Sequence, residues 1–310
     1  MSAPRSSLPD SSSGLPIGGH TRLLGVLGDP VRHSLSPAMH NAALRQLGLD
    51  WVYLPLPVAH DHLANLLRSL EAIDAVGANV TIPHKQAAAR LADELTPLAR
   101  QLGAVNTLVR RPGGGWLGTN TDVEGFLAPL GTRDRWAGRR ALVLGCGGSA
   151  RAVLAGLAQL ELAEVRVAAR DSQRLAAFCA GCRPWARAVA LPWAAVAEAI
   201  GDADLVVNTT PIGMASDADA DAARLSPLDG PAAAALPATA TVYDLIYTPR
   251  PTALLRQAGE RGCQLIDGLE MLVQQGAASL RLWSGRAEVP VAAMRAAALE
   301  RLTAGPGPAP

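Results

Sequence analysis

The sequence predicts an α/β protein that contains two mainly parallel β-sheets. Short apolar runs alternate with stretches of helical period in two successive series along the chain, a pattern typical of βαβ units. The chain has 310 residues, 49% of them hydrophobic. That is enough for two cores, since a domain usually has about 100–200 residues. A glycine-rich turn directly follows the first strand of the second series.

The first series begins at Arg22. Short apolar runs predict strands at residues 22–28, 51–56, 77–82, 107–110 and 116–118. Helical spacing of the apolar residues predicts helices at 37–47 and 61–70, between the first three strands. The alternation of strand and helix predicts a mainly parallel first sheet.

The second series begins after Gly138. Its expected strands, each rich in Val, Ile or Leu, are residues 141–144, 164–169, 205–208, 241–245 and 264–266. Strands this apolar are typical of a parallel sheet that is covered on both faces. The expected helices are residues 149–160, 172–180 and 251–260. Residues 215–239, rich in Asp, Ala and Pro, predict a long surface loop, and two last helices are expected at 269–283 and 291–302.

The glycine-rich turn reads Val143-Leu-Gly145-Cys-Gly147-Gly-Ser-Ala150 and fits the pattern G-x-G-x-x-G/A. In that pattern Gly145 makes the tight turn, Gly147 lets the backbone approach a pyrophosphate, and Ala150 lets the helix pack closely on the strand. A diphosphate would lie at the helix N-terminus, where unpaired N–H groups attract anions. The turn therefore predicts a Rossmann-type dinucleotide-binding sheet, the alternative being an ordinary glycine-rich turn.

The end of the second strand of this series indicates the cofactor. Enzymes that use NAD usually have an acid here for the ribose hydroxyls. This chain has Ala169-Arg170-Asp171-Ser-Gln-Arg174. On a helix that had already begun, Arg170 and Arg174 would converge on one phosphate, which favours NADP. Asp171 either binds a bare ribose, which favours NAD, or caps the next helix.

Polar residues also stand at the ends of elements outside the glycine-rich turn. In Ser34-Leu-Ser36-Pro37, Ser36 fits a helix N-cap, and the two hydroxyls also suit a carboxylate. Thr81 and Lys85 follow a strand, where open α/β sheets bind ligands, although a single lysine there is more often a surface charge. The remaining polar residues, typical of turns, caps or helices, are Asn106, Asp122 and Gln275.

Taken together, these segments resemble the shikimate dehydrogenase family over residues 22–303. Eight motifs occur in the order of that family. They are Ser34-x-Ser-Pro, Asn79-Val-Thr-x-Pro-x-Lys85, Gly103-Ala-Val-Asn-Thr, Asn120-Thr-Asp122, Gly145-x-Gly-Gly, Asn208-Thr-Thr-Pro-x-Gly213, Asp244-x-x-Tyr247 and Asp267-Gly-Leu-x-Met-Leu-x-x-Gln275. The resemblance implies a reversible NADPH-dependent reduction of 3-dehydroshikimate to shikimate, on the route to chorismate and the aromatic amino acids.

The resemblance also implies roles for individual residues. Lys85 and Asp122 would be the catalytic pair. The implied substrate-binding residues are Ser34, Ser36, Thr81, Lys85, Asn106, Asp122, Tyr247 and Gln275. The implied cofactor-binding residues are Gly145, Cys146, Gly147, Gly148, Ser149, Ala169, Arg170, Asp171, Arg174, Leu245 and Gly268.

The resemblance further implies a discontinuous domain arrangement. Residues 22–121 would form an α/β substrate-binding domain completed by 269–303, and residues 122–268 the Rossmann domain. The chain departs from the family pattern at Val123, where glycine is common, and at Ala169-Arg170-Asp171, where Asn-Arg-Thr or Asn-Arg-Ser is common. The first departure is expected to change only local packing, and the second bears on cofactor preference.

The chemistry expected of the catalytic pair follows from the reaction. Hydride transfer to a ketone leaves negative charge developing on the oxygen, which a neighbouring cation stabilises and a proton neutralises. Lys85 suits both tasks, with Asp122 positioning it, and which of the two moves the proton stays open. The redox chemistry belongs to NADP, so no metal is expected.

Composition gives no sign of a macromolecular partner. The 28 basic and 27 acidic residues nearly balance, which argues against nucleic acid or an anionic membrane as a partner. No apolar run approaches the roughly 20 residues that span a bilayer, and residues 1–19 lack the apolar core of a signal peptide. A cytoplasmic protein is therefore expected, with disordered tails at 1–21 and 304–310. The C-x-x-C spacing of Cys179 and Cys182 is interpreted as coincidence.

Three other functions compete with this one. The nearest is a dehydrogenase that uses quinate as well as shikimate, with NAD or with both cofactors. A second is a nucleotide-binding module without turnover, which the presence of Lys85 and Asp122 disfavours. A third, a folate-linked dehydrogenase of similar layout, is disfavoured by the motifs at Ser34 and Asn79. Whether the protein is a monomer or a homodimer stays open.

Overall fold

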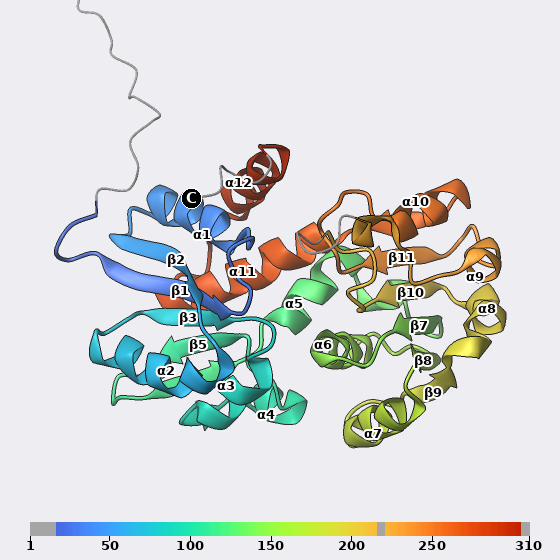
Figure 1. Ribbon diagram of the computed structural model, residues 1–310, viewed down its shortest axis with the longest axis horizontal. Helices are drawn as coiled ribbons and strands as arrows, with labels where there is room; N and C mark the ends of the chain where they lie inside the picture. The colour runs from blue at the N-terminus through green and yellow to red at the C-terminus, as the bar shows by residue number, and fades with distance from the viewer. Residues whose placement is uncertain (1–16, 216–220, 305–310) are drawn as a thin grey trace, which may run out of the picture.

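The computed structural model describes residues 17–215 and 221–304 of the chain. Two six-stranded sheets lie side by side, each covered by helices on both faces, as Figure 1 shows. The expected tails fall mostly on residues 1–16 and 305–310, outside the described residues. The two-sheet α/β architecture confirms the expected fold class.

The first sheet is mainly parallel, as expected, with β5 as the one strand among the described residues that runs in the opposite direction. Its strands are β1 (Arg22–Gly28), β2 (Trp51–Pro57), β3 (Gly77–Val80), β4 (Glu94–Leu95), β5 (Thr107–Arg110) and β6 (Trp116–Thr119), in the order β2-β1-β3-β5-β6-β4. β1 is parallel to β2 and β3, whereas β5 is antiparallel to β3 and β6. The turn between β5 and β6 contains Gly114 and Gly115 at positive φ and is too short for a parallel crossover.

The second sheet is parallel throughout. Its strands are β7 (Arg140–Leu144), β8 (Glu164–Ala169), β9 (Val189–Pro192), β10 (Leu205–Asn208), β11 (Thr241–Asp244) and β12 (Gln264–Ile266). Read from one edge, the order is β9-β8-β7-β10-β11-β12, with the topological switch between β7 and β10. This is the doubly wound order of dinucleotide-binding sheets, and it confirms the expected Rossmann-type architecture.

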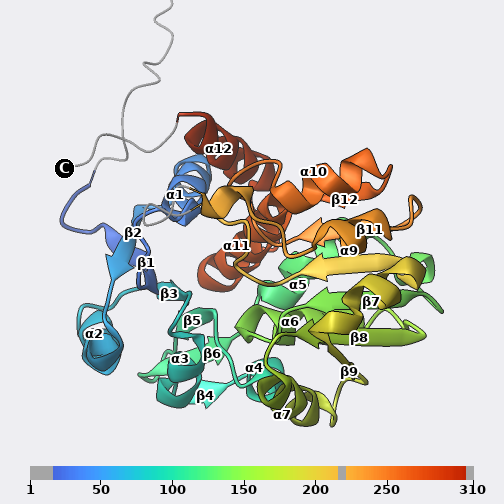
Figure 2. The same ribbon diagram turned by 45° about the vertical axis from the view of Figure 1, so that its right-hand side comes forward.

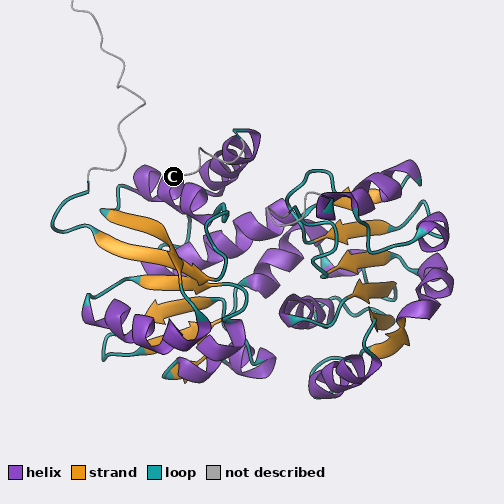
Figure 3. Ribbon diagram, in the orientation of Figure 1, coloured by secondary structure: helices purple, strands orange, loops and turns teal. Residues whose placement is uncertain are grey.

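Helices cover both faces of both sheets, as the colouring in Figure 3 makes plain. On the first sheet, one face carries α1 (Ser36–Leu47), α11 (Gly268–Ser284) and α12 (Val291–Thr303), and the other α2 (Leu63–Ala72), α3 (Lys85–Leu91) and α4 (Pro97–Leu102). On the second sheet, one face carries α5 (Asp122–Leu127), α6 (Gly148–Leu157) and α7 (Ser172–Cys182), and the other α8 (Val196–Ala199), α9 (Gly230–Ala234) and α10 (Ala253–Glu260). Short 3₁₀ turns lie at His60–His62, Ala128–Leu130, Arg133–Arg135, Trp193–Ala195, Ile200–Asp202 and Ala222–Arg224.

The stretch expected to be one long surface loop contains a helix instead. Residues 216–220 lie outside the described residues, but α9 follows them and buries Ala232 and Ala233 against the second sheet. Asp229 caps this helix, its side chain accepting a hydrogen bond from Ala232 N. Sequence patterns do not reveal this helix because its five residues make little more than one turn, too short for a helical period of apolar residues.

Helices α5 and α11 pack against each other between the two sheets, as Figures 1 and 2 both show. α11 begins beside the second sheet, yet its residues Val273, Leu280 and Trp283 pack with the core of the first sheet. Gly125 makes the close approach of α5 possible, because a Cβ there would lie 2.6 Å from Met271 O. The last helices thus pack on the sheet that is formed by the beginning of the chain. No helix in residues 17–215 and 221–304 is both long and apolar enough to cross a membrane.

Candidate active site

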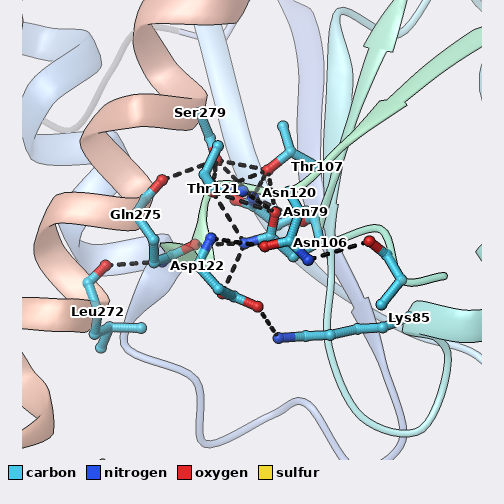
Figure 4. Close-up of polar contacts among 11 residues, drawn as sticks. Asn79, Lys85, Asn106, Thr107, Asn120, Thr121, Asp122, Leu272, Gln275 and Ser279 are labelled. Carbon is cyan, nitrogen blue, oxygen red and sulfur yellow. Dashed lines mark hydrogen bonds and ion pairs between the residues drawn. The ribbon is translucent and has the colours of Figure 1, made fainter. Parts of the chain in front are cut away.

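A lysine and an aspartate form a close ion pair where the two halves of the chain meet. Lys85 Nζ donates a hydrogen bond to Asp122 Oδ2 over 2.6 Å, as Figure 4 shows. Their side chains are only 18% and 9% exposed. An ion pair that is largely withdrawn from water interacts more strongly than a surface pair, and it holds the ammonium group in a fixed place.

The backbone on either side of the pair fixes both residues. β3 ends at Val80, two residues earlier than expected, because His84 N donates to Thr81 O and turns the chain into α3. Lys85 is the first residue of α3, and its carbonyl accepts from Val105 N at 2.9 Å. Asp122 begins α5, and its N–H donates to the side chain of Asn120 at 3.0 Å.

Asn106 orients the aspartate. Its Nδ2 donates to Asp122 Oδ1 over 2.8 Å, so one carboxylate oxygen bonds to Asn106 and the other to Lys85. Its Oδ1 accepts from the backbone N–H of Thr121 at 2.7 Å, which fixes the direction of the amide. Asn106 Nδ2 also lies 3.3 Å from Gln275 Oε1, which brings helix α11 to the same site. The structure therefore brings together four predicted site residues: Lys85, Asn106, Asp122 and Gln275.

Several residues of this site had no predicted role. Ser279, fully buried on α11, contacts the side chains of Asn79, Thr107 and Thr121. Ser279 stands four residues after Gln275, so the two share one face of the helix, and that spacing was the available sequence signal. Tyr53 lies behind this group, its hydroxyl donating to Asn79 Oδ1 at 2.7 Å.

The other predicted substrate residues have no hydrogen bond to Lys85, Asn106, Asp122 or Gln275 among the contacts of the described residues, although the side chain of Ser36 bonds to Tyr53. Ser36 is the first residue of α1 rather than its N-cap, so the capping interpretation is wrong. The reason is that Leu35 takes the cap position, while Ser36 N donates to Ser34 Oγ at 3.2 Å. Thr81 follows β3, which pairs in parallel with β1, so the segments that follow these two strands leave the same edge of the sheet. Tyr247 packs against the core of the first sheet, and burial raises the pKa of its hydroxyl.

His40 links two of the elements that carry predicted substrate residues. It is fully buried, and its ring nitrogens lie 2.9 Å from Ser36 O and 3.3 Å from Gly276 O. Its ring also stacks on Tyr53 at 4.2 Å between centroids. Burial lowers the pKa of His40 from 6.5 to about 4, although both carbonyls oppose the shift. The imidazole is therefore neutral near pH 7, and its single N–H donates to one of the two carbonyls, on α1 or on α11.

We expect His40 to make folding pH-dependent. Because the pKa is lower in the folded state, the unfolded chain binds the proton more tightly. Titration of His40 does not change the free energy of unfolding above about pH 6.5. The free energy decreases as the pH falls from there to about 4, and the total loss is about 3 kcal/mol for this shift of the pKa. Chemical unfolding at several pH values should show a smaller loss of unfolding free energy in His40→Gln than in wild type. Exposed His20→Gln is the control, and equal losses in wild type and His40→Gln would contradict the prediction.

The glycine-rich turn has the geometry expected for a dinucleotide. Gly145 has φ +103°, and a Cβ there would lie 2.6 Å from Thr209 Oγ1. Gly147 is the N-cap of α6, and a Cβ at Gly147 or Gly148 would meet no heavy atom within 4 Å. The N-terminus of this helix is therefore open to a phosphate group, and no side chain caps it.

The segment after β8 places two arginines beside this turn. α7 begins at Ser172, so Arg170 precedes the helix and Arg174 lies in its first turn. The prediction that helical spacing brings the two arginines together is therefore wrong. A ligand that both of them bind would contact Arg170 from the loop and Arg174 from the helix. Asp171 is the N-cap, its Oδ1 accepting from Arg174 N at 2.9 Å. Both guanidinium groups are exposed, and within the described part of the chain neither has an ion pair or a side-chain hydrogen bond.

The last two predicted cofactor residues touch each other. A Cβ on Gly268, the first residue of α11, would lie 2.0 Å from Leu245 O. Leu245 in turn follows β11 and donates its N–H to Asn208 O at 3.1 Å. Only glycine allows the start of α11 to lie this close to the loop after β11.

We expect Gly268→Ala to be strongly destabilising. The added methyl group collides with a backbone carbonyl, which no side-chain rotation can relieve, so the loop or the helix must move. Overpacking of this kind costs about 1–3 kcal/mol or more. Urea unfolding should show the loss, while Gly113→Ala, where a Cβ would meet nothing within 4 Å, should change little. Equal midpoints for the two variants would rule out the proposed close contact.

The cysteines take no part in this site apart from Cys146 in the glycine-rich turn. Cys179 and Cys182 are free and buried in the core of the second sheet, and burial raises the pKa of both thiols. Raised pKa values disfavour the reactive thiolate form. Among the described residues, no three His, Cys, Asp or Glu side chains gather as a metal-binding group.

Known proteins resemble this chain in sequence and in structure. The family models described as shikimate dehydrogenase substrate binding domain and shikimate 5′-dehydrogenase C-terminal domain match residues 26–108 and 268–299. A protein of Synechocystis sp. PCC 6803, named shikimate dehydrogenase (NADP(+)), is 50% identical over 293 residues, covering 92% of this chain and 98% of that protein.

Two solved structures have nearly the same fold. A shikimate dehydrogenase crystallised with NADP⁺ superposes with a TM-score of 0.82 at 32% identity, covering 93% of this chain and 98% of the other. A quinate dehydrogenase from Corynebacterium glutamicum, crystallised with NAD, gives a TM-score of 0.80 at 31% identity, covering 91% and 99%. With 50% of the 293 aligned residues identical to a relative that is covered to 98%, the chain belongs to the shikimate dehydrogenase family.

Proposed function

We propose that this protein catalyses the reversible, NADP-dependent oxidation of shikimate to 3-dehydroshikimate. The observation that carries the proposal is the 2.6 Å pair of Lys85 and Asp122, held by Asn106 beside the dinucleotide-type sheet. An ammonium group fixed in a largely water-free site suits a reaction in which charge develops on a ketone oxygen. The relative with 50% identity bears the name of this activity.

We propose Lys85 as the group that both stabilises the oxygen and exchanges its proton. A bound NADPH would provide the hydride that the ketone carbon takes up in the direction of reduction. The oxygen that becomes a hydroxyl then takes a proton from Lys85 Nζ. Asp122, whose two oxygens accept from Lys85 and Asn106, positions the ammonium group and a substrate hydroxyl. Ser34 and Ser36 suit the substrate carboxylate, while Thr81, Asn106, Tyr247 and Gln275 suit its hydroxyls and keto oxygen.

The residues present fit NADP. The open N-terminus of α6 suits the diphosphate, and the exposed, unpaired Arg170 and Arg174 suit the 2′-phosphate. Asp171 already accepts the hydrogen bond that caps α7, so its position has a structural explanation that does not require a bare ribose. Gly268 and Leu245, which lie in close contact, would also help to hold the cofactor.

One assay separates this proposal from its rivals: oxidation of shikimate and of quinate with NADP⁺ and with NAD⁺, in all four combinations. The proposal expects the highest kcat/KM for shikimate with NADP⁺. The quinate alternative has the support of a quinate dehydrogenase with nearly the same fold, and comparable rates with quinate would establish it. No turnover in any combination, with NADP⁺ still bound, would favour a nucleotide-binding module.

Three further expectations belong to the proposal. We place the domain boundaries near residues 122 and 268, so that residues 269–303 complete the substrate-binding domain. This agrees with the packing of α11 and α12 on the first sheet. Cytoplasmic location and a monomeric or homodimeric state stay predictions, which fractionation and light scattering would test.

A further inference from the structure

Ser279 is a buried hydroxyl in an otherwise apolar stretch of α11. Its side chain is fully buried, and its neighbours on the helix, Ala277, Ala278 and Leu280, are all buried core residues. A polar group withdrawn from water destabilises the fold unless it is hydrogen-bonded. The hydroxyl of Ser279 has ample partners, because four groups lie within hydrogen-bond distance of its oxygen.

The directions of these bonds follow from what each partner is able to do. Gln275 O only accepts, so the hydroxyl of Ser279 donates to it at 3.0 Å. Asn79 Nδ2 only donates, and it bonds to Ser279 Oγ at 2.9 Å. Ser279 Oγ therefore still has room to accept from the hydroxyl of Thr107 at 2.8 Å or that of Thr121 at 3.2 Å.

These partners lead directly to the catalytic pair. Thr107 donates its one hydrogen to Asn106 Oδ1 at 2.9 Å, which leaves Thr121 to donate to Ser279. Thr121 Oγ1 in turn accepts from Asn106 Nδ2 at 2.9 Å. The amide of Asn106 donates to Asp122 Oδ1, whose other oxygen bonds to Lys85. Figure 4 shows the whole sequence of contacts from α11 to the lysine. Each member is buried or half-buried, so no water competes strongly for its bonds.

We propose that Ser279 is a positioning residue for the reaction: its oxygen accepts from Thr121, which accepts from Asn106 Nδ2, so that Asn106 aims Asp122 at Lys85. The proposal rests on the proposed function. It also assigns a second task to the helix that carries Gln275, since α11 then sets the geometry of the pair as well as contacting the substrate. Ser279 itself does not touch the reacting atoms.

The test is Ser279→Ala, which removes the hydroxyl and changes the size of the side chain little. Because small misplacements of reacting groups cost up to about 100-fold, we expect kcat for shikimate to fall about 10-fold. KM for NADP⁺ should stay within about two-fold of wild type, since the dinucleotide-type turn is untouched. Ser284→Ala is the matched control. Ser284 lies on the same helix and donates to the carbonyl four residues back, Leu280 O, but takes no part in the group around Asn106.

A spectroscopic readout separates positioning from stability. Lys85 is the only lysine in the sequence, so isotope-labelled lysine gives a single side-chain resonance in NMR spectra. If Ser279 positions the pair, this resonance shifts or broadens in Ser279→Ala and stays in place in Ser284→Ala. Should the alanine variant fail to fold, Ser279→Cys keeps the size and weakens the acceptor, and the same measurement applies.

Two results would overturn the inference: an unmoved lysine resonance in folded Ser279→Ala, or a kcat equal to that of Ser284→Ala. Failure of the proposed function is recognised separately. Wild-type protein would then lack activity with shikimate, while the lysine resonance would still report whether Ser279 orders the pair.

Discussion

Lys85→Ala should lower kcat for shikimate oxidation at least about 100-fold, the usual contribution of a positioned acid or base. The ammonium group lies 2.6 Å from Asp122 Oδ2, and the side chain of Lys85 is only 18% exposed. We therefore do not expect a cation from the solvent to replace the ammonium group in the alanine variant. Steady-state kinetics with NADP⁺ measures the loss. KM for shikimate should change much less, because several other side chains are available to bind the substrate. Turnover within a few-fold of wild type would remove Lys85 from the mechanism.

Lys85→Arg is the matched control for charge. A guanidinium group keeps the pairing with Asp122 but does not release a proton in proteins. We therefore expect this variant to stay nearly as slow as Lys85→Ala, with better retained substrate binding. Full recovery in Lys85→Arg would show that positive charge alone suffices and that the proton comes from elsewhere.

The composition of the chain indicates a functional role for Lys85 more strongly than its position after a strand does. Every basic residue other than histidine is arginine, with the single exception of Lys85. A chain that uses arginine for all its other permanent cations retains an ammonium group at one place, where a removable proton is useful. That compositional fact identifies Lys85 independently of any resemblance.

The rest of the site was predictable in part. Asn106, Asp122 and Gln275 were identified through motifs, and the structure joins them by hydrogen bonds. Ser279 was not, because a serine within an apolar helix is usually explained by the bond of its hydroxyl to the carbonyl four residues back. The other partners of Ser279 are known only from the packing of α11 on the first sheet. This packing brings Ser279 to Thr107, which lies 172 positions earlier in the chain.

The sequence predicted the strand directions of the second sheet more completely than those of the first. All strands of the second sheet except β9 were expected, because buried parallel strands are continuous apolar runs. β9 has four residues, mostly exposed, and gives no such signal. In the first sheet, alternation of strand and helix correctly predicted mainly parallel strands. It did not predict the antiparallel direction of β5, which depends on a short glycine turn rather than on any strand pattern.

Arg170→Ala combined with Arg174→Ala should abolish the preference for NADP⁺. Neither guanidinium has a protein partner among the described residues, and a hydrogen bond to a charged group contributes about 1.5–3 kcal/mol. Loss of both contacts to the 2′-phosphate should therefore lower kcat/KM with NADP⁺ about 100-fold, with shikimate as substrate. The value with NAD⁺ should stay within a few-fold, since NAD⁺ lacks that phosphate and Asp171 remains to accept from its ribose.

The control for this change is Arg183→Ala combined with Arg187→Ala, which removes the same charge beyond the other end of α7 from two exposed positions. If a general loss of positive charge weakened NADP⁺ binding, both double variants would behave alike, and salt would diminish the effect in both. A specific phosphate site affects only the first. If wild type already prefers NAD⁺, or the first double variant keeps its preference for NADP⁺, the arginines are not the phosphate site. We would then expect Asp171 to decide the cofactor, because its carboxylate lies between the two arginines in the segment that follows β8.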